Sequence, residues 1–436
     1  MAICSDDLEA LEADRWIEHH YDFDAHRNSP PQNRFVFHGL TLKARELVYA
    51  VGHGEQDAQK RARLAWERKD CILTDHEPIP HDEKLKGSLR YSYHAAKHSL
   101  TSLLYPHGLF AGLPWFFQTW ARDAAISLPA LADIGHIKEA KTLLFKLIDS
   151  IGADGLIQSC VNPLAGPRVF DGVGWIFHSA RYLLDNHASE FTGADRQRII
   201  SKLLDSIEAL KKTHIKDSLL YTGPLGTCMD SSCGGDDRAG ARIEHQALFL
   251  AMLSFKIKEG HYDPLEKEMS SKVRYVFFRN NSLYDGQDDP TIRPNIFLAY
   301  KAYPALLKTD EWESCFDSAI PKLWCSWGGL SSIDTSNPLF IGISTGEDST
   351  SYHRGDSWYW INNVAAGCMW DLDKKKYQNY INKIILASTK DILSLGALGH
   401  HSEVSSAHNQ TGSGCLSQAW SMAAYLDLIK MIHQKK

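Results

Sequence analysis

Two carboxylic acids lie on glycine-rich segments far apart in the chain, and together they could hydrolyse a glycosidic bond. Asp230 is the single acid of residues 223–235, and Glu403 is the single acid of residues 398–414. Hydrolysis of such a bond needs one protonated carboxyl group for the leaving oxygen and one carboxylate that activates water or attacks. An acid on a glycine-rich loop can equally be a turn former or a helix cap. The interpretation therefore needs sugar-binding residues to accompany the pair.

Side chains of the kinds that bind sugars recur at the start of several predicted helices. Residues 114–123 combine aromatic rings, an amide, an arginine and an aspartate, and residues 350–362 repeat this mixture. Residues 171–178 and 293–295 add two more such segments. A ring contacts the C–H face of a sugar, while arginine and aspartate bind its hydroxyl groups. Any one segment could be ordinary core, but together they are hard to explain by packing alone, and they predict a carbohydrate site.

The composition is that of an ordinary globular protein, with 436 residues, of which 44% are hydrophobic and 23% are charged. The net charge of −6 gives no electrostatic case for binding nucleic acid or an anionic membrane. The nine cysteines are odd in number and form no Cys-x-x-Cys pair, which favours free thiols in a reducing compartment. The sequence has no secretory signal at its start and no apolar run of about 18 residues, so we predict a cytoplasmic protein. The adjacent His400 and His401 could suggest zinc, but no further ligands accompany them, and no metal or cofactor is expected.

From about Leu89 onward, the apolar residues follow a helical period, as at Ile199, Leu203 and Ile207. The pattern predicts roughly twelve helices, near residues 88–105, 121–134, 137–151, 173–187, 194–213, 241–259, 262–279, 294–307, 310–323, 356–371, 373–394 and 414–434. Strand signals are sparse. The candidate chemistry lies mostly in the longer loops, which indicates that one end of a helical barrel is functional.

Residues 1–86 differ from the rest, because they are charged and are interrupted by the proline-containing residues 29–33. They offer one predicted strand at 47–52, a polar helix at 56–69 and a linker at 77–82. We predict that this region is a residual accessory segment with a linker helix. Residues 87–436 are then the catalytic domain.

In the order of its motifs, the chain resembles the glucosidase part of glycogen debranching enzymes, the amylo-α-1,6-glucosidases. The family's Arg-Asp motif before an apolar helix resembles residues 119–128, and its Thr-Trp-Met-Asp motif resembles residues 227–230. The family's glutamate-containing helix is similar to residues 242–248, and its Arg-Pro-Asn motif to residues 293–295. Its His-Arg-Gly-x-x-Trp motif is similar to residues 353–358, and its closing glutamate to Glu403. Its Gly-Cys-x-x-Gln-Ala-Trp-Ser motif is similar to residues 414–421. The resemblance spans roughly residues 90–436.

The resemblance implies an all-α fold, an (α/α)6 barrel in which six helical hairpins form a toroid, preceded by a short irregular N-terminal region. It also implies an inverting glycoside hydrolase that releases glucose from α-1,6-linked branch stubs of glycogen or a limit dextrin, so that the partner is an α-glucan. Asp230 would be the general acid and Glu403 the general base, with their carboxyl groups roughly 6.5–9.5 Å apart to admit a water molecule. The residues that would hold the glucosyl group, form ring walls around it or lie directly behind it are Trp115, Trp120, Arg122, Asp123, Trp175, Glu244, His353, Arg354, Trp358 and Trp360.

Three residues depart from the family pattern. Cys228 replaces a tryptophan beside the acid, Ala121 replaces a glycine, and Phe249 stands where a tryptophan is usual. Such changes could reshape the sugar subsites, so two alternatives stay open. One is a glucoamylase-like or trehalase-like α-glucosidase that uses the same two acids on another linkage, and the other is a glycan-binding protein without catalysis. The presence of both acids favours an enzyme, and no motif predicts an oligomeric state.

Overall fold

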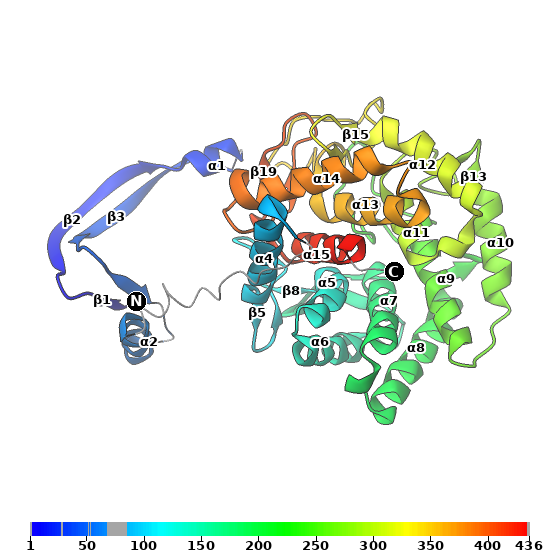
Figure 1. Ribbon diagram of the computed structural model, residues 1–436, viewed down its shortest axis with the longest axis horizontal. Coiled ribbons are helices and arrows are strands. Elements are labelled where there is room, and N and C mark those ends of the chain that lie inside the picture. Colours follow the sequence, from blue (N-terminus) through cyan, green and yellow to red (C-terminus); the bar gives the residue numbers. More distant parts are fainter. Residues whose placement is uncertain (1, 28, 51, 53, 68–84, 434–436) are drawn as a thin grey trace. The chain divides into compact units, whose positions relative to one another are not determined.

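The computed structural model describes residues 2–27, 29–50, 52, 54–67 and 85–433. The chain divides into two compact units, residues 1–83 and residues 84–436 (Figure 1). The second unit contains both candidate acids and every residue of the predicted sugar site.

The described part of the first unit contains four strands and two helices. Strand β1 (Ala2–Cys4) pairs antiparallel with β4 (Val48–Ala50), and α2 (Glu55–Glu67) packs against both. Strands β2 (Glu9–His20) and β3 (Asn33–Lys43) form a long antiparallel hairpin, with the short helix α1 (Asp22–His26) between them (Figure 1).

The sequence analysis expects a single strand in this region, at residues 47–52, and it is wrong about the β2–β3 hairpin. Strand β4 lies within the predicted range, and α2 covers the described part of the predicted helix. The hairpin was missed because β2 is rich in charged residues and has no regular alternation of apolar and polar residues, although residues 40–43 in β3 do alternate. The predicted linker at residues 77–82 lies outside the described residues.

Between Gly87 and His433, a range that the structure describes throughout, the second unit forms twelve α-helices, one in each predicted range. They are α4 (Gly87–Ser102), α5 (Ala121–Asp133), α6 (Ile137–Ser150), α7 (Asp171–Asn186), α8 (Gly193–Thr213), α9 (Ile243–Lys258), α10 (Leu265–Phe277), α11 (Asn295–Ala302), α12 (Thr309–Leu323), α13 (Tyr359–Asp373), α14 (Gln378–Lys390) and α15 (Ala419–His433). Short 3-10 turns occur at Ala188–Glu190 and Pro304–Leu306, and a π-helical turn at Asp391–Leu395. The second unit is mostly helical, as predicted.

Helices α8 and α9 show how the local sequence decides which helices lie inside. Helix α8 starts with a capping box, in which Thr192 accepts the N–H of Asp195 and the Asp195 carboxylate accepts the N–H of Thr192. Its apolar residues Ile199, Leu203 and Ile207 form one buried stripe, and its other face is polar. Helix α9 buries nearly every residue instead. The amphipathic helix therefore lies outside and the apolar helix inside.

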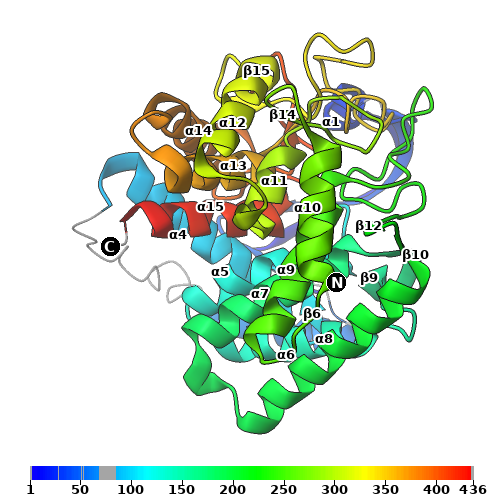
Figure 2. The same cartoon turned by 90° about the vertical axis from the view of Figure 1, so that its right-hand side faces the viewer.

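Six helices pack against one another in a closed cycle. Helix α5 contacts α7, the contacts continue through α9, α11 and α13 to α15, and α15 contacts α5. We call α5, α7, α9, α11, α13 and α15 the six-helix cycle. The other six helices lie outside it, each against a member of the cycle (Figures 1 and 2). Because an outer helix runs back between successive members, all six members start at the same end.

Short antiparallel strands connect the loops of the second unit. The pairs are β5 (Leu104–Tyr105) with β6 (Gly108–Leu109), β7 (Gly112–Leu113) with β20 (Ser417–Gln418), β11 (Ile215–Lys216) with β12 (Leu219–Leu220), β13 (Phe278–Arg279) with β14 (Ser282–Leu283), and β15 (Trp324–Cys325) with β16 (Gly329–Leu330). Two small sheets have three strands each, namely β8 (Thr119–Trp120), β9 (Ile157–Asn162) and β10 (Leu164–Val169), and β17 (Ser357–Trp358), β18 (Val404–Ser405) and β19 (Gly412–Ser413). These pairings bring together loops that precede α5, α13 and α15. Of the helices that the structure describes, none combines the length and apolar character needed to cross a membrane.

Candidate active site

Glu403 lies in a loop that is fixed on both sides. It directly precedes β18, in which Val404 pairs with Trp358. The N–H of Glu403 donates to the carbonyl of Cys415 at 2.8 Å, and the N–H of Cys415 donates to Glu403 Oε2 at 2.9 Å. Gly414 permits this close approach, because its φ is +66° and a Cβ atom there would lie 2.3 Å from Glu403 Oε2.

The side chain of Glu403 is buried beside a tyrosine. Glu403 is 2% exposed, and the Tyr352 hydroxyl donates to its Oε1. Burial raises the pKa of Glu403 to about 7, the bonds from Tyr352 and Cys415 lower it, and the charge of Asp230 raises it. A carboxyl group with a pKa near neutrality can exchange a proton at physiological pH, as acid–base catalysis requires.

Asp230 is held by an arginine from the first turn of α5. Arg122 Nη2 donates to Asp230 Oδ2 at 2.9 Å, and Arg122 Nη1 donates to the carbonyl of Thr227 at 2.9 Å. Arg122 Nε also lies 3.5 Å from Asp171 Oδ2 at the start of α7. Two members of the six-helix cycle thus fix the loop of Asp230, whose own side chain is 35% exposed.

The structure brings the two acids to the same end of the six-helix cycle. The charge of Asp230 contributes to the raised pKa of Glu403 and to the raised pKa of Tyr352. Hydrogen bonds connect their loops as well, because Ser231, next to Asp230, bonds to His353, and Tyr352, next to His353, donates to Glu403. Asp230, Glu403 and Tyr352 therefore belong to one cluster, although some 170 residues separate the acids in sequence.

Asp123 belongs to the same cluster. It follows Arg122 in α5, and its Oδ1 accepts a hydrogen bond from Gln418 Nε2 at 2.8 Å. Burial raises the pKa of Asp123 to about 8, Arg122 lowers it and the charge of Glu403 raises it. A protonated carboxyl group can donate a hydrogen bond as well as accept one, which suits a sugar hydroxyl.

His353 also supports the Asp230 loop, through Ser231. Its Nδ1 shares a hydrogen bond of 2.7 Å with the hydroxyl of Ser231, and its ring stacks on Trp358 with centroids 5.1 Å apart. Burial and nearby arginines lower the pKa of His353 well below its usual range, so the imidazole is neutral. A neutral imidazole positions the loop without adding a second cation beside the acid.

Arg354 has a different place from the one the sequence analysis gives it. Its Nη2 donates to the carbonyls of Ser231 and Asp236 at 2.6 and 2.7 Å, and its Nε lies 3.1 Å from the Asp236 carboxylate. Arg354 is 1% exposed. Its guanidinium is occupied by the protein, so it fixes the loop that follows Asp230 instead of binding a sugar hydroxyl.

Glu244 is likewise enclosed by protein. Arg238 donates to both of its oxygens, at 2.8 and 3.1 Å, and Asn295 donates to Oε1 at 2.7 Å. The same arginine bridges to Asp285 at 2.7 Å. Burial raises the pKa of Glu244, but Arg238 outweighs it and holds this pKa at about 2. Glu244 is therefore a buried anion that lies behind the acids and orders the loop before α9.

The tryptophans that were predicted to line the sugar site divide into two groups. Trp115 is 39% exposed, and Trp120 packs edge-to-face on Phe116 at 5.6 Å in the loop before α5. Trp358 donates its indole N–H to the carbonyl of Tyr352 at 2.7 Å, so it supports the Glu403 partner directly. The structure places these rings at the end with the acids.

Trp175 and Trp360 belong to the other group. They are buried and contact each other at 6.3 Å, and both line a second cavity deeper in the helices. Trp360 stacks on Trp420, which contacts Trp358, so these two rings lie between the second cavity and the end with the acids.

Two residues of the cluster were missed by the sequence analysis. Tyr352 binds Glu403, and Gln418 binds Asp123. Tyr352 directly precedes the motif at residues 353–358, and Gln418 lies within the motif at residues 414–421. Both residues therefore adjoin motifs that the sequence analysis identified. Their partners could not be identified, because the bonds join loops paired only by short strands.

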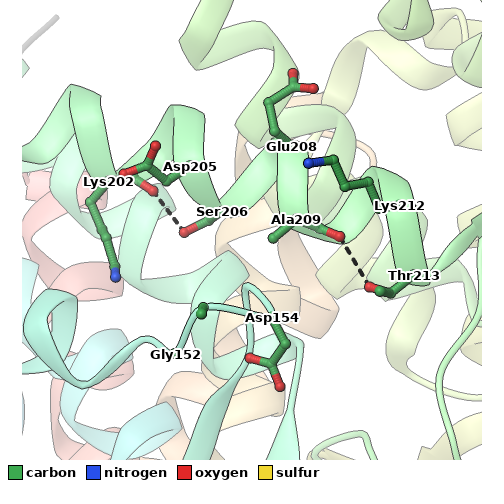
Figure 3. Close-up of a pocket in the computed structure, with 10 residues that line it drawn as sticks. Gly152, Asp154, Lys202, Asp205, Ser206, Glu208, Ala209, Lys212 and Thr213 are labelled. Carbon is green, nitrogen blue, oxygen red and sulfur yellow. Dashed lines mark hydrogen bonds between the residues drawn. The ribbon is translucent and has the colours of Figure 1, made fainter.

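Other features do not compete with this cluster as a catalytic site. Within the described residues, no group of three or more metal-ligating side chains could hold a metal ion. A surface groove of about 490 Å³ lies between α8 and the loop after α6 (Figure 3). It is lined by charges of both signs, such as Asp154, Lys202 and Glu208, and contains no aromatic ring and none of the predicted site residues.

Comparisons with known proteins identify the family of the chain. Residues 97–427 match the amylo-alpha-1,6-glucosidase family. A search of curated protein sequences found no match. The GH63 mannosylglycerate hydrolase from Thermus thermophilus, solved in complex with glucose, is similar with 14% identity and a TM-score of 0.57 over 77% of this chain and 99% of that chain. A glycosidase is similar with 12% identity and a TM-score of 0.58 over 78% and 97% of the two chains.

At these identities the solved structures share the fold alone with this chain. The family match is the stronger finding, because it covers most of the sequence and includes Arg122, Asp230 and Glu403. The chain therefore belongs to the amylo-alpha-1,6-glucosidase family of glycoside hydrolases.

Proposed function

We propose that the chain is an inverting amylo-α-1,6-glucosidase that releases glucose from the branch stub of a glycogen-like α-glucan. The observation that carries the proposal is the cluster of Asp230, Glu403 and Tyr352, in which Tyr352 donates to Glu403 and the adjacent His353 bonds to Ser231 beside Asp230. Arg122 from α5 holds Asp230 in this cluster, and the neighbouring Asp123 supplies a carboxyl group for a sugar hydroxyl.

In the proposed mechanism, Asp230 donates a proton to the glycosidic oxygen while the bond from this oxygen to C1 of glucose breaks. Glu403 accepts a proton from a water molecule, and the water oxygen bonds to C1 from the opposite face. The products are glucose of inverted configuration and a shortened α-glucan. Arg122 binds Asp230 Oδ2, so Oδ1 is the oxygen that would carry the transferred proton.

The assignment of acid and base follows the family resemblance. The pKa of Glu403, about 7, suits a base in its ionised form and an acid in its protonated form. The neighbouring Tyr352 and Cys415 donate hydrogen bonds to Glu403, which stabilise a carboxylate. These two donors favour Glu403 as the base.

We also propose that the six-helix cycle and its outer helices are an (α/α)6 barrel. The alternation of inner and outer helices and the contact of α15 with α5 support this architecture. Residues 1–86 would be a residual accessory segment with a linker helix. A two-stranded hairpin is marginally stable alone, and Trp16, Phe35 and Phe37 on β2 and β3 are exposed, which fits the remainder of a larger β domain.

A cytoplasmic location is part of the proposal, because glycogen-like polymers are intracellular stores and because the cysteines fit a reducing compartment. Eight cysteines are free in the part of the chain that the structure describes, and six of them are buried. Cys71 lies outside that part.

A panel of substrates tests the linkage. The full chain is incubated with an isomaltosyl-branched dextrin, maltose, trehalose and mannosylglycerate, and free glucose or mannose is measured over time. We expect glucose from the branched dextrin, with the β-anomer as the first product in the proton NMR spectrum. The Asp230→Asn variant serves as the matched control for contaminating glucosidase activity.

Other outcomes of the same panel would point elsewhere. Release from maltose or trehalose alone would identify a glucoamylase-like or trehalase-like enzyme. Cleavage of mannosylglycerate alone would extend the likeness to the Thermus thermophilus hydrolase from fold to substrate. Binding of the dextrin without any product would indicate a glycan-binding protein, and α-glucose as the first product would exclude inversion.

A further inference from the structure

A second cavity lies where the helices of the six-helix cycle finish. Its volume is about 450 Å³, within the range of about 300–1,000 Å³ that is common for small-molecule pockets. Five members of the cycle line it, among them α5 with Asp133, α11 with Lys301, α13 with Asp371 and α15 with Met431, all in the last turns of their helices. The cavity is therefore at the end opposite to Asp230.

A layer of tryptophans separates this cavity from the two acids. Trp175 of α7 meets Trp360 of α13 edge-to-face at 6.3 Å. Helices α7 and α13 stand opposite each other in the cycle, so this contact crosses its centre. Trp360 stacks on Trp420 at 4.7 Å, and Trp420 contacts Trp358 at 5.8 Å. The second cavity and the acid cluster are separate sites.

Two of the acids in the cavity have partners within the protein. Asp133 pairs with Lys430 and accepts a hydrogen bond from the Tyr182 hydroxyl at 2.7 Å. Asp371 accepts a hydrogen bond from the Tyr300 hydroxyl at 3.0 Å. These groups are satisfied without a ligand.

Lys301 and Asp427 lack such partners. Both line the cavity and are partly buried, and the Lys301 ammonium acts on the Asp427 carboxyl, whose pKa burial raises to about 7. Within the described residues, neither side chain forms an ion pair or a hydrogen bond. The buried indole N–H of Trp360 also has no hydrogen-bond partner among the described residues. The cavity therefore presents a cation and a carboxyl group that no ion pair or hydrogen bond within the described chain satisfies.

These groups restrict the chemistry of a ligand. An apolar compound would leave the Lys301 and Asp427 charges buried without a partner, at a considerable cost. An anion would meet three aspartates, and a cation would meet two lysines. A neutral polyhydroxy compound satisfies all of them, because a hydroxyl group both donates and accepts and its C–H face packs on an indole ring.

We propose that this cavity is a second carbohydrate site, which binds a neutral polyol of monosaccharide size. Lys301 donates to a hydroxyl oxygen, the Asp427 carboxyl bonds to a second hydroxyl group, and the rings of Trp175 and Trp360 form the floor. The inference uses no residue of the acid cluster, so it does not depend on the proposed function.

Gly367 of α13 offers a way to block the cavity. It lines the cavity, and a Cβ atom there would lie 3.7 Å from Met431 Cε, which is ordinary van der Waals contact. Gly367→Leu fills the space that the ligand would occupy, whereas Gly367→Ala adds one methyl group and serves as the matched control. Melting curves of both variants establish that they fold.

Isothermal titration of the full chain with D-glucose counts the sites. We expect the wild-type chain and Gly367→Ala to bind one more glucose per chain than Gly367→Leu. This difference is independent of whether the acid cluster also binds glucose, so the inference can hold where the proposed function fails, and the reverse. An equal number of sites in all three proteins would overturn the inference.

Polar substitutions give a second readout that does not rely on packing. Lys301→Met and Asp427→Asn each remove a charged hydrogen-bonding group. Each should weaken, about tenfold, the binding of glucose at the site that Gly367→Leu blocks. Inorganic phosphate and tetramethylammonium serve as anionic and cationic probes. Unchanged affinity for glucose in both variants, or displacement of glucose by either probe, would contradict a polyol site.

Discussion

The two ends of the six-helix cycle are built differently from the same helices. At the end where the helices start, the acids come from loops or first turns, and arginines such as Arg122 and Arg238 hold them. At the end where the helices finish, the charged groups belong to the helices themselves, with Lys301 and Lys430 in last turns. The unpaired N–H groups of a helix start favour carboxylates, and its final carbonyls favour lysines. The comparison teaches that the two candidate acids are held by an arginine and by loop N–H groups, whereas the opposite end combines lysines and aspartates of the helices themselves.

The largest expected effect comes from neutralising the acids at the end where the helices start. In Asp230→Asn or Glu403→Gln, we expect the rate of glucose release from branched dextrin to fall about 10²–10⁴-fold, since each variant loses one proton-transfer group. Asp205→Asn, on the exposed face of α8, is the control and should keep the wild-type rate. Retention of activity within tenfold in either acid variant would remove that residue from the mechanism.

The buried arginine at the same end should matter for stability. Arg238→Met leaves Glu244 and Asp285 buried without their cation, and we expect a loss of about 3–5 kcal/mol in the free energy of unfolding, measured in urea. Arg196→Met removes a more exposed pair with Glu259 and should cost less than about 1 kcal/mol.

Equal losses in these two variants would show that burial of the Arg238 cluster is unimportant. If Arg238→Met does not fold, Arg238→Lys keeps the charge and should show an intermediate loss, because lysine cannot reproduce the bidentate bonds.

A pH profile sharpens the assignment of roles within the acid cluster. If Glu403 is the base, it must be ionised, so kcat/KM should rise with pH and level off above its pKa of about 7. Tyr352→Phe removes a bond that stabilises the carboxylate, and this rising limb should move up by about one pH unit. Tyr275→Phe, with an exposed ring, is the control. A fall in kcat/KM through pH 7 would instead make Glu403 the acid.

The smallest expected effect is on thermal stability and concerns Asp427, at the end where the helices finish. Asp427 has a folded-state pKa of about 7, above its unfolded value of about 3.9, because burial outweighs Lys301, while Asp133 adds to the rise and Lys430 opposes it. The Asp427 carboxyl group therefore contributes fully to the free energy of unfolding below pH 4, and this contribution is lost as the pH rises through 7.

Asp427→Asn should therefore reduce, by a few degrees, the fall in melting temperature between pH 5.5 and pH 8. Asp123, with a pKa of about 8, and Glu403 continue to produce the remaining fall. The same pH dependence in the variant and in the wild-type chain would indicate that Asp427 titrates as an exposed acid.

Much of the fold could be predicted from the sequence, because helix periodicity is a local property. The stripe of Ile199, Leu203 and Ile207 defines α8 without any knowledge of its neighbours. The β2–β3 hairpin was not predicted, since the charged sequence of β2 shows no regular alternation that would mark a strand.

The candidate site was predictable only in part. Motif order pointed to Asp230, Glu403 and Arg122, and the structure places them in one cluster. The places of Arg354 and Trp360 were not predictable, because a sequence motif does not show whether a side chain faces a ligand or the protein. Tertiary contacts decide this, as the bonds from Arg354 to the Asp230 loop illustrate.

The contact between Trp175 and Trp360 has a consequence for how a polymer could be handled. Because these rings meet across the middle of the helices, a glucan cannot thread through the ring of helices from one side to the other. The substrate and the freed sugar would have to use the same opening, at the end with the acids. Movement of a polymer through the ring of helices would then be excluded by the scaffold, independently of the catalytic groups.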